Sequence, residues 1–222
     1  MSTKSIIGIQ NANGTIQAIF CHWSGQPTQN GQTLLQHYKS EEKIRELIAI
    51  CNISVLGEHL TPKAGQPHHA TKGQENTVLA YGRDWGKNSD TGIQWKSVKD
   101  LTKEVAKYID ADYYYIWTSG TWLCAKQESM KFMTIEQAQK AYTFDYIKYL
   151  FANYAEVCPR LENGYIDWKA VKLQPEYKVF ENDLNRLHFV TFTPHDFNTV
   201  SKEDRTLKVD FLYKNEWFTI NA

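Results

Sequence analysis

The start of the chain alternates between apolar and polar positions in two short runs separated by a turn. Residues 5–10 and 15–23 have the length and period of β-strands, and alternate residues from Ile16 to His22 share one face. Residues 11–14 favour a turn, because Asn and Gly tolerate a positive φ angle. The pattern therefore predicts an opening β-hairpin, which the loop at residues 24–27 ends.

Helical spacing replaces this alternation further along the chain. Ser40 can cap a helix that places Ile44 and Leu47 on one apolar face. The sequence Thr134-Ile135-Glu136-Gln137 matches a capping box and predicts a helix that runs to about Tyr154. Shorter helices are expected over residues 33–38 and around residues 98–109.

Runs rich in aromatic and β-branched residues predict the remaining strands, while residues 57–76 are polar and are expected to form a long exposed loop. The sequence predicts an α+β fold in which helices pack on antiparallel hairpins. We expect two subdomains, an N-terminal α+β domain at residues 1–127 and a C-terminal region of helix and hairpins at 128–222. The expected strands cover residues 77–81, 112–117, 121–125, 187–191, 207–213 and 216–220.

Composition narrows the class of protein. Acidic and basic residues balance at 25 each, so no net field draws the chain onto nucleic acid or an anionic membrane. No apolar run approaches the roughly 20 residues that span a bilayer, which predicts no membrane segment. The four cysteines form no C-x-x-C pair, and the first apolar run has strand length rather than signal-peptide length. These features predict a cytoplasmic protein with reduced thiols.

The first candidate for chemistry is the end of the second predicted strand. His22 could titrate near neutral pH or bind a ligand, and Trp23 lies beside it. Cys21 and His22 are neighbours in a strand, so their side chains point to opposite faces and cannot pair as nucleophile and base. The alternative is that His22 packs under the loop and hydrogen-bonds to the backbone.

The second candidate is the segment from Tyr81 to Gly86. Arg83 could grip a carboxylate or phosphate, and Asp84 could orient His22 or His37. The alternative is an Arg–Asp pair that only stabilises a turn.

Other polar pairs are less promising. His68-His69 fits a solvated loop better than a metal site, and His195-Asp196 fits a turn or helix cap. We predict neither a metal site nor a cofactor, since the nucleotide-binding, dinucleotide-binding, nucleophile-elbow and zinc-protease motifs do not occur.

Four stretches resemble a family of small proteins from bacteriophages and bacterial mobile elements, to which no activity is assigned. The family pattern Y-C-H-W-D-G-Y-P corresponds to Phe20–Pro27, and its Leu-rich helix ending in H-Y to Leu34–Tyr38. The patterns A-Y-x-R-D-R-G and G-x-W correspond to Ala80–Gly86 and Gly120–Trp122. The resemblance covers about the first 125 residues, and no counterpart is apparent after Lys126.

The resemblance carries over no activity, and the candidate segments predict a set of ligand- or partner-binding residues and no catalytic residue. Ser24 stands where the family has Asp, Gln26 where it has Tyr, and Trp85 where it often has Arg. Loss of a family carboxylate at Ser24 favours binding over catalysis. The expected binding site consists of His22, Trp23, Gln26, His37, Tyr38, Tyr81, Arg83, Asp84 and Trp85.

Three functions are compatible with these residues. The first is a phage accessory protein that binds and inhibits a host protein or protein–nucleic-acid complex, such as a CRISPR or other immune effector, with the C-terminal region supplying the partner-specific face. The surplus of Tyr and Trp favours it. The second is a nucleotide or small-molecule binder that sequesters an immune signal. The third is a hydrolase that uses His22 and Asp84.

Overall fold

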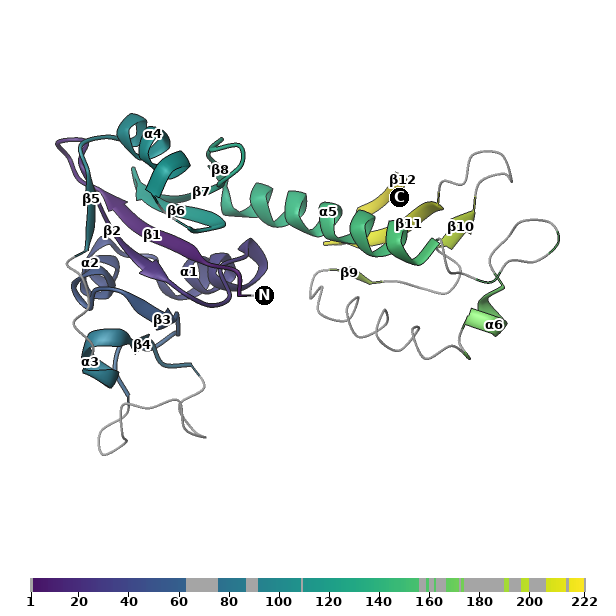
Figure 1. The fold of residues 1–222 in the computed structure, drawn as a ribbon, viewed down its shortest axis with the longest axis horizontal. Coiled ribbons are helices and arrows are strands. Elements are labelled where there is room, and N and C mark those ends of the chain that lie inside the picture. Colours follow the sequence, from purple (N-terminus) through teal and green to yellow (C-terminus); the bar gives the residue numbers. More distant parts are fainter. Residues whose placement is uncertain are drawn as a thin grey trace. The chain divides into compact units, whose positions relative to one another are not determined.

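The chain forms two compact units, residues 1–139 and 140–222, in a computed structural model (Figure 1). The predicted boundary after residue 127 precedes this division, because strand β8 (Met133–Thr134) pairs with the first sheet. Helix α5 (Ile135–Ala155) begins in the first unit and continues into the second. The residues that the structure describes are 2–62, 76–86, 92–108, 110–155, 159, 162, 167–171, 173, 190–191, 197–199, 207–214 and 216–221.

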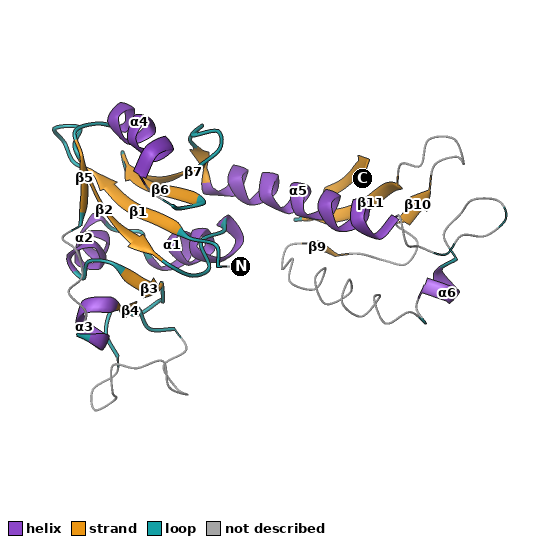
Figure 2. Ribbon diagram, in the orientation of Figure 1, coloured by secondary structure: helices purple, strands orange, loops and turns teal. Residues whose placement is uncertain are grey.

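The first unit contains a sheet of eight described strands with helices packed on it, which confirms the α+β class (Figure 2). Seven strands follow the order β4-β3-β2-β1-β6-β7-β8, and β5 pairs with β2. Besides β8, the strands are β1 (Ser5–Gln10), β2 (Ile16–Cys21), β3 (Ile53–Val55), β4 (Leu79–Ala80), β5 (Ile93–Trp95), β6 (Tyr113–Thr118) and β7 (Thr121–Lys126).

The sheet is mixed, so the expectation of a wholly antiparallel sheet is wrong in part. The β1–β2 and β6–β7 hairpins are antiparallel as predicted. However, β1 pairs with β6 in parallel, and β2 pairs with β3 in parallel. Hairpin signals report only pairing between neighbours in sequence, whereas these parallel pairs join segments separated by long connections.

Strand β1 lies at the centre of the first unit and is buried on both faces from Ser5 to Ile9. Its Ile6 side chain joins a core cluster that also includes alternate residues of β2 and β6 and Leu101 of helix α4. Helix α2 packs on β1 and β2. The cluster consists of Ile6, Ile16, Ala18, Trp95, Leu101, Ala111, Tyr114 and Ile116.

Local capping chemistry explains where two predicted helices begin. Ser40 Oγ accepts a hydrogen bond from the Lys43 N–H at the start of α2. Thr134 and Gln137 exchange side-chain-to-backbone hydrogen bonds at the start of α5, as a capping box requires. Besides the start of α5, the helices described in the first unit are the π-helical turn η1 (Pro27–Gly31), α1 (Gln32–His37), α2 (Glu41–Ala49), α3 (Tyr81–Trp85) and α4 (Val98–Tyr108).

Two short strands share the outer edge of β2. Strand β5 pairs antiparallel with Ile16–Ala18, and β3 pairs in parallel at Cys21. Between them, the Phe20 N–H donates to Asn52 Oδ1 at 2.9 Å, so a side-chain amide replaces a main-chain acceptor at the junction. Neither short strand was predicted, because three residues are too few to show a period.

Among its described residues, the second unit contains a four-stranded sheet and part of α5. Strands β11 (Leu207–Tyr213) and β12 (Glu216–Asn221) form a hairpin that confirms the predicted strands there. Strands β9 (Val190–Thr191) and β10 (Phe197–Thr199) pair with β11, and Phe144 of α5 packs edge-on against Phe218. Helix α6 spans Trp168–Val171.

Candidate functional site

The loop His22–Pro27, called the Trp23 loop below, continues the parallel pairing of β2 with β3. The N–H groups of His22 and Trp23 donate to the carbonyls of Ile53 and Ser54 at 3.2 and 3.0 Å. The Trp23 carbonyl accepts from Asn30 Nδ2 at 3.1 Å. The backbone that carries Trp23 is therefore fixed on both sides.

Buried groups of the fold also hold the next two residues of the loop. Ser24 has a φ angle of 62°, a left-handed conformation that costs an L-residue roughly 1–2 kcal/mol. Gly25 follows, and a Cβ atom there would lie 2.6 Å from the carbonyl carbon and oxygen of Lys4. The Tyr115 hydroxyl donates to the Gly25 carbonyl at 2.7 Å. A strained backbone persists only where its surroundings hold it, as they do here.

The side chains at the end of β2 present aromatic surface. Trp23 is 47% exposed although its backbone is fixed. The His22 ring lies 4.8 Å from the Trp23 ring and 6.1 Å from the Phe20 ring, measured between centroids. Thus His22 lies between two aromatic rings, tilted against Trp23 and edge-on to Phe20.

Cys21 lies beneath this loop and is unsuited to nucleophilic chemistry. Its side chain is buried, and its Sγ donates to the Trp23 carbonyl. Burial raises the pKa of the thiol to about 11, so the thiol is neutral near pH 7.

Gln26 belongs to the same loop and precedes η1. Its Oε1 atom is buried and accepts no hydrogen bond within the described residues. An unpaired buried acceptor costs free energy, and nothing in the first unit explains this one.

His37 and Tyr38 lie at the end of α1 and face the segment after β3. The buried Tyr38 hydroxyl donates to the Gly57 carbonyl at 2.7 Å, and burial raises its pKa. His37 Nδ1 lies 3.6 Å from Glu58 Oε1. Gly57 is buried, so the predicted exposed loop at residues 57–76 does not begin as expected; residues 63–75 lie outside the described part.

Residues 81–85 form the short helix α3, not the turn suggested by the flanking glycines. The Asp84 carboxylate accepts from the Ala80 N–H at 2.7 Å near the start of the helix. Gly86 ends the helix with a φ angle of 61°, which glycine adopts without strain. A single turn of helix is too short to produce an apolar period, so the sequence pattern does not predict it.

The guanidinium of Arg83 donates hydrogen bonds to groups within the first unit. Its Nε and Nη2 atoms donate to the two oxygens of Asp84 at 2.8 and 2.9 Å. The guanidinium also donates to the carbonyls of Leu60 and Val78. The Asp84 side chain is fully buried. This geometry matches the structural alternative for the Arg–Asp pair and leaves little of the guanidinium for a phosphate.

The rings of α3 form a second exposed aromatic pair. Tyr81 and Trp85 lie 5.2 Å apart between centroids, and Trp85 is 41% exposed.

The sheet separates the two candidate segments. Strand β3 runs parallel to β2, and β4 runs antiparallel to β3. Both β2 and β4 end beside Ile53, the first residue of β3. The Trp23 loop then continues along Ser54, whereas the Tyr81 N–H at the start of α3 donates to the Asn52 carbonyl. Strand β3 also lies between them. The structure groups His22, Trp23 and Gln26, and places Tyr81, Arg83, Asp84 and Trp85 apart from them.

Sequence reasoning missed the residues that hold the Trp23 loop, Asn30 and Tyr115. Asn30 is buried and its amide also contacts Ser5 and Cys21. In the sequence, Asn30 is a polar residue near a turn and Tyr115 is a tyrosine within an apolar strand. Neither feature indicates a contact with a loop elsewhere in the chain.

No group of His, Cys, Asp or Glu in the described residues is arranged to hold a metal ion. His68-His69 and His195-Asp196 lie outside those residues. Among the described helices, none has the length and apolar character required to cross a bilayer.

Comparison with known proteins finds no matching family model, no similar curated protein and no similar solved structure.

Proposed function

We propose that the chain is a binding protein that docks on a host macromolecule through the Trp23 loop. The observation that carries this proposal is an exposed tryptophan on a backbone that the core holds in place. Tryptophan is enriched among the residues that dominate interface energies, and a loop whose backbone is already held need not be ordered on binding. The partner is a protein or a protein–nucleic-acid complex of the host cytoplasm.

The resemblance to phage proteins supports the particular form of this function. A phage protein that binds a host immune effector, including a CRISPR effector, inhibits it by occupying its surface. Such a role needs no catalytic group. The raised pKa of Cys21 keeps its thiol neutral near pH 7, which favours binding over thiol chemistry. The C-terminal unit contributes a further contact surface, on which Tyr149 is 62% exposed.

The geometry is less favourable to the other two functions. A nucleotide pocket would need Arg83 beside the rings of His22 and Trp23, whereas β3 lies between these segments. A hydrolase would need the Asp84 carboxylate to orient His22, whereas that carboxylate accepts from Arg83 and from the Ala80 N–H.

Two tryptophans of similar exposure provide a matched test. The full chain, its Trp23→Ala variant and its Trp85→Ala variant are immobilised, and host lysate is passed over each. We expect the wild type and Trp85→Ala to retain one host protein in stoichiometric amount. Purified partner should bind Trp23→Ala about thirtyfold more weakly, the loss typical of a dominant interface residue. Equal affinities of the two variants, or no stoichiometric partner, would count against the proposal.

A further inference from the structure

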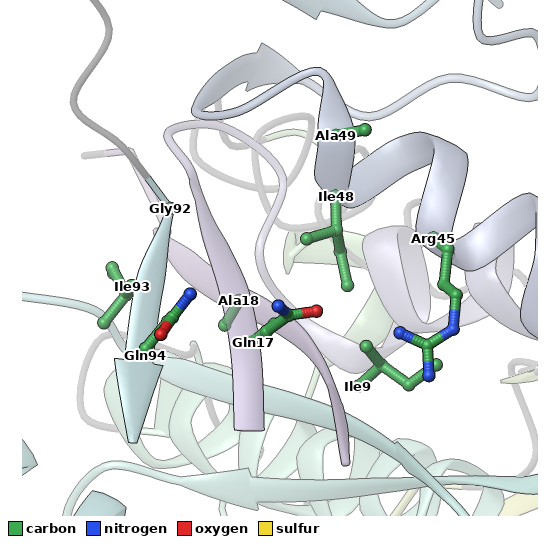
Figure 3. A pocket seen from close by; sticks show the side chains of 9 residues that line it. All are labelled: Ile9, Gln17, Ala18, Arg45, Ile48, Ala49, Gly92, Ile93 and Gln94. Atoms are coloured by element: carbon green, nitrogen blue, oxygen red, sulfur yellow. The ribbon is translucent and has the colours of Figure 1, made fainter. Parts of the chain in front are cut away.

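A groove of about 320 Å³ lies between α2 and β5, and none of the predicted binding residues lines it (Figure 3). Strands β1, β2 and β5 form its floor and the second half of α2 forms its wall. Its volume falls at the lower end of the range for small-molecule sites. The residues used below are Ile9, Gln17, Arg45, Ile48, Ala49 and Gln94.

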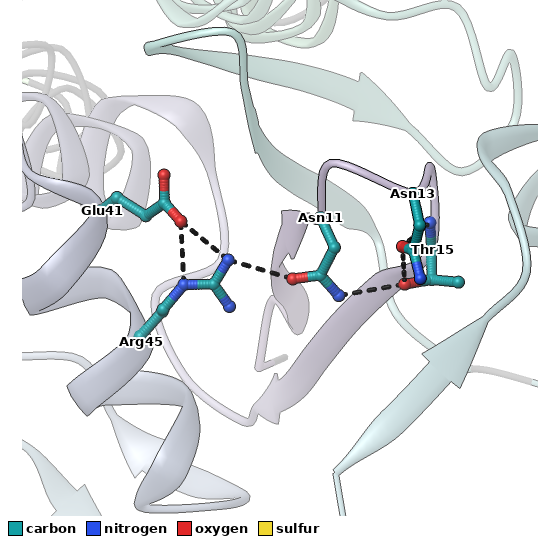
Figure 4. A network of polar contacts seen from close by, with 5 residues as sticks. All are labelled: Asn11, Asn13, Thr15, Glu41 and Arg45. Carbon is teal, nitrogen blue, oxygen red and sulfur yellow. Dashed lines mark hydrogen bonds and ion pairs between the residues drawn. The ribbon is translucent and has the colours of Figure 1, made fainter.

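Arg45 brings an oriented cation to this groove. Its Nε and Nη2 atoms donate to Glu41 Oε1 at 2.9 and 2.7 Å, and Nη2 also donates to Asn11 Oδ1 at 3.0 Å (Figure 4). Asn11 is in turn held by Thr15. The Nη1 atom makes no hydrogen bond to any described residue. Arg45 therefore differs from Arg83 in keeping one end of its guanidinium available for an anion.

Two glutamines supply neutral hydrogen-bonding groups on the floor. Gln17 of β2 and Gln94 of β5 lie directly opposite each other in the strand register, so their side chains share one face. Neither side-chain amide hydrogen-bonds within the part of the chain that the structure describes. Figure 3 shows the amide of Gln17 directed toward Ile9 and Arg45. An amide offers both a donor and an acceptor, which suits a peptide-like group.

Apolar side chains complete the wall and the floor. Ile48 projects from α2 toward the sheet, and Ile9 lies below Arg45 (Figure 3). A ligand that fits must therefore combine an anionic group, an amide and a branched aliphatic body.

We infer that this groove binds a small carboxylate with a branched aliphatic body and a neighbouring amide, as in an N-acylated aliphatic amino acid. Arg45 Nη1 donates to the carboxylate, the amides of Gln17 and Gln94 meet the ligand amide, and Ile9 and Ile48 cover the aliphatic body. The site is separate from the Trp23 loop and does not depend on the proposed function.

The test follows side-chain NMR signals of the full chain during titration with N-acetyl-L-leucine. A ligand of this size binds in the millimolar range at best. We expect saturable shifts of the Arg45 Nε–H signal and of the side-chain amide signals of Gln17 and Gln94. N-acetyl-L-leucinamide, which lacks the charge, and N-acetylglycine, which lacks the aliphatic body, should each bind about tenfold more weakly.

Three variants complete the experiment. Arg45→Gln should weaken binding about tenfold, while Lys39→Gln, at an exposed basic residue outside the groove, should not change it. Ala49→Trp places a ring in the groove from an exposed helix position and should abolish the shifts with the backbone spectrum otherwise preserved. The inference is overturned if those three signals do not move at about 10 mM ligand. Equal shifts with the leucinamide, or full binding by Ala49→Trp, would overturn it as well.

Discussion

The Trp23 loop and helix α3 each display a half-exposed tryptophan beside a short strand, yet the fold holds them in different ways. The Trp23 loop is fixed by residues distant in sequence, Asn30 and Tyr115, and contains a left-handed serine. Helix α3 is fixed by the Arg83–Asp84 pair, whose guanidinium also donates to the Leu60 and Val78 carbonyls, and by a glycine cap. The contrast teaches that a charged motif such as Arg83–Asp84 can serve only to stabilise a local structure. A binding site is better indicated by an exposed side chain whose backbone is held by buried residues.

The largest expected effect concerns α3. Asp84→Ala removes the partner of Arg83 and leaves the Ala80 N–H without its acceptor, so we expect a loss of roughly 3–5 kcal/mol of unfolding free energy. Urea denaturation measures it. Asp110→Ala, which breaks an exposed ion pair with Lys4, should cost less than about 1 kcal/mol. Similar losses in both variants would mean that the Arg83–Asp84 pair does not hold α3.

A smaller effect is expected in the Trp23 loop from Gly25→Ala. The added methyl group meets the Lys4 backbone, so the loop must shift, at a cost of about 1–3 kcal/mol and with weaker partner binding. Gly14→Ala is the control, since its Cβ meets nothing within 4 Å and only its φ angle of 84° is unfavourable. If Gly25→Ala binds the partner as wild type does, the shape of the loop is not what the partner recognises.

The variants Tyr115→Phe and Tyr38→Phe test whether a buried hydroxyl under the Trp23 loop matters for binding as well as for stability. Each removes one buried hydroxyl that donates at 2.7 Å to a glycine carbonyl, Gly25 or Gly57. Both should lose about 1–2 kcal/mol of unfolding free energy, but only Tyr115→Phe should weaken partner binding. Calorimetric titration with purified partner separates them, and equal affinities would show that the hydroxyl does not position Trp23.

The smallest effect has the opposite sign. Ser24→Asn should raise the unfolding free energy by about 0.5 kcal/mol, because Asn tolerates the left-handed region better than Ser. Ser119→Asn, at a φ angle of 50° in the β6–β7 turn, should stabilise similarly without affecting binding. Thermal unfolding of both variants provides the measurement, and a destabilised Ser24→Asn would contradict the account of strain.

Features encoded by neighbouring residues could be predicted from the sequence, and features that depend on distant pairing could not. The first hairpin, the Ser40 cap and the Thr134–Gln137 capping box each arise within a few residues, and all are present. The parallel pairing of β1 with β6 depends on the whole intervening chain, and leaves no local period.

The candidate site shows the same division. The pattern predicts that His22 and Trp23 lie at a strand end, as they do. It gives no sign that β4 pairs with the edge of β3 opposite to β2, which sets Arg83 and Trp85 apart from the Trp23 loop. Nor does it reveal that Arg45, and not Arg83, keeps a guanidinium nitrogen unpaired among the described residues.

The divided outer edge of β2 has a consequence for solubility. A six-residue apolar strand with a bare edge is a template on which other chains can add strands and aggregate. Here β5 and β3 each pair with part of that edge, and the Asn52 side chain accepts the Phe20 N–H between them. The Phe20 N–H is thereby occupied by a side-chain acceptor and is not available to pair with a strand of another chain.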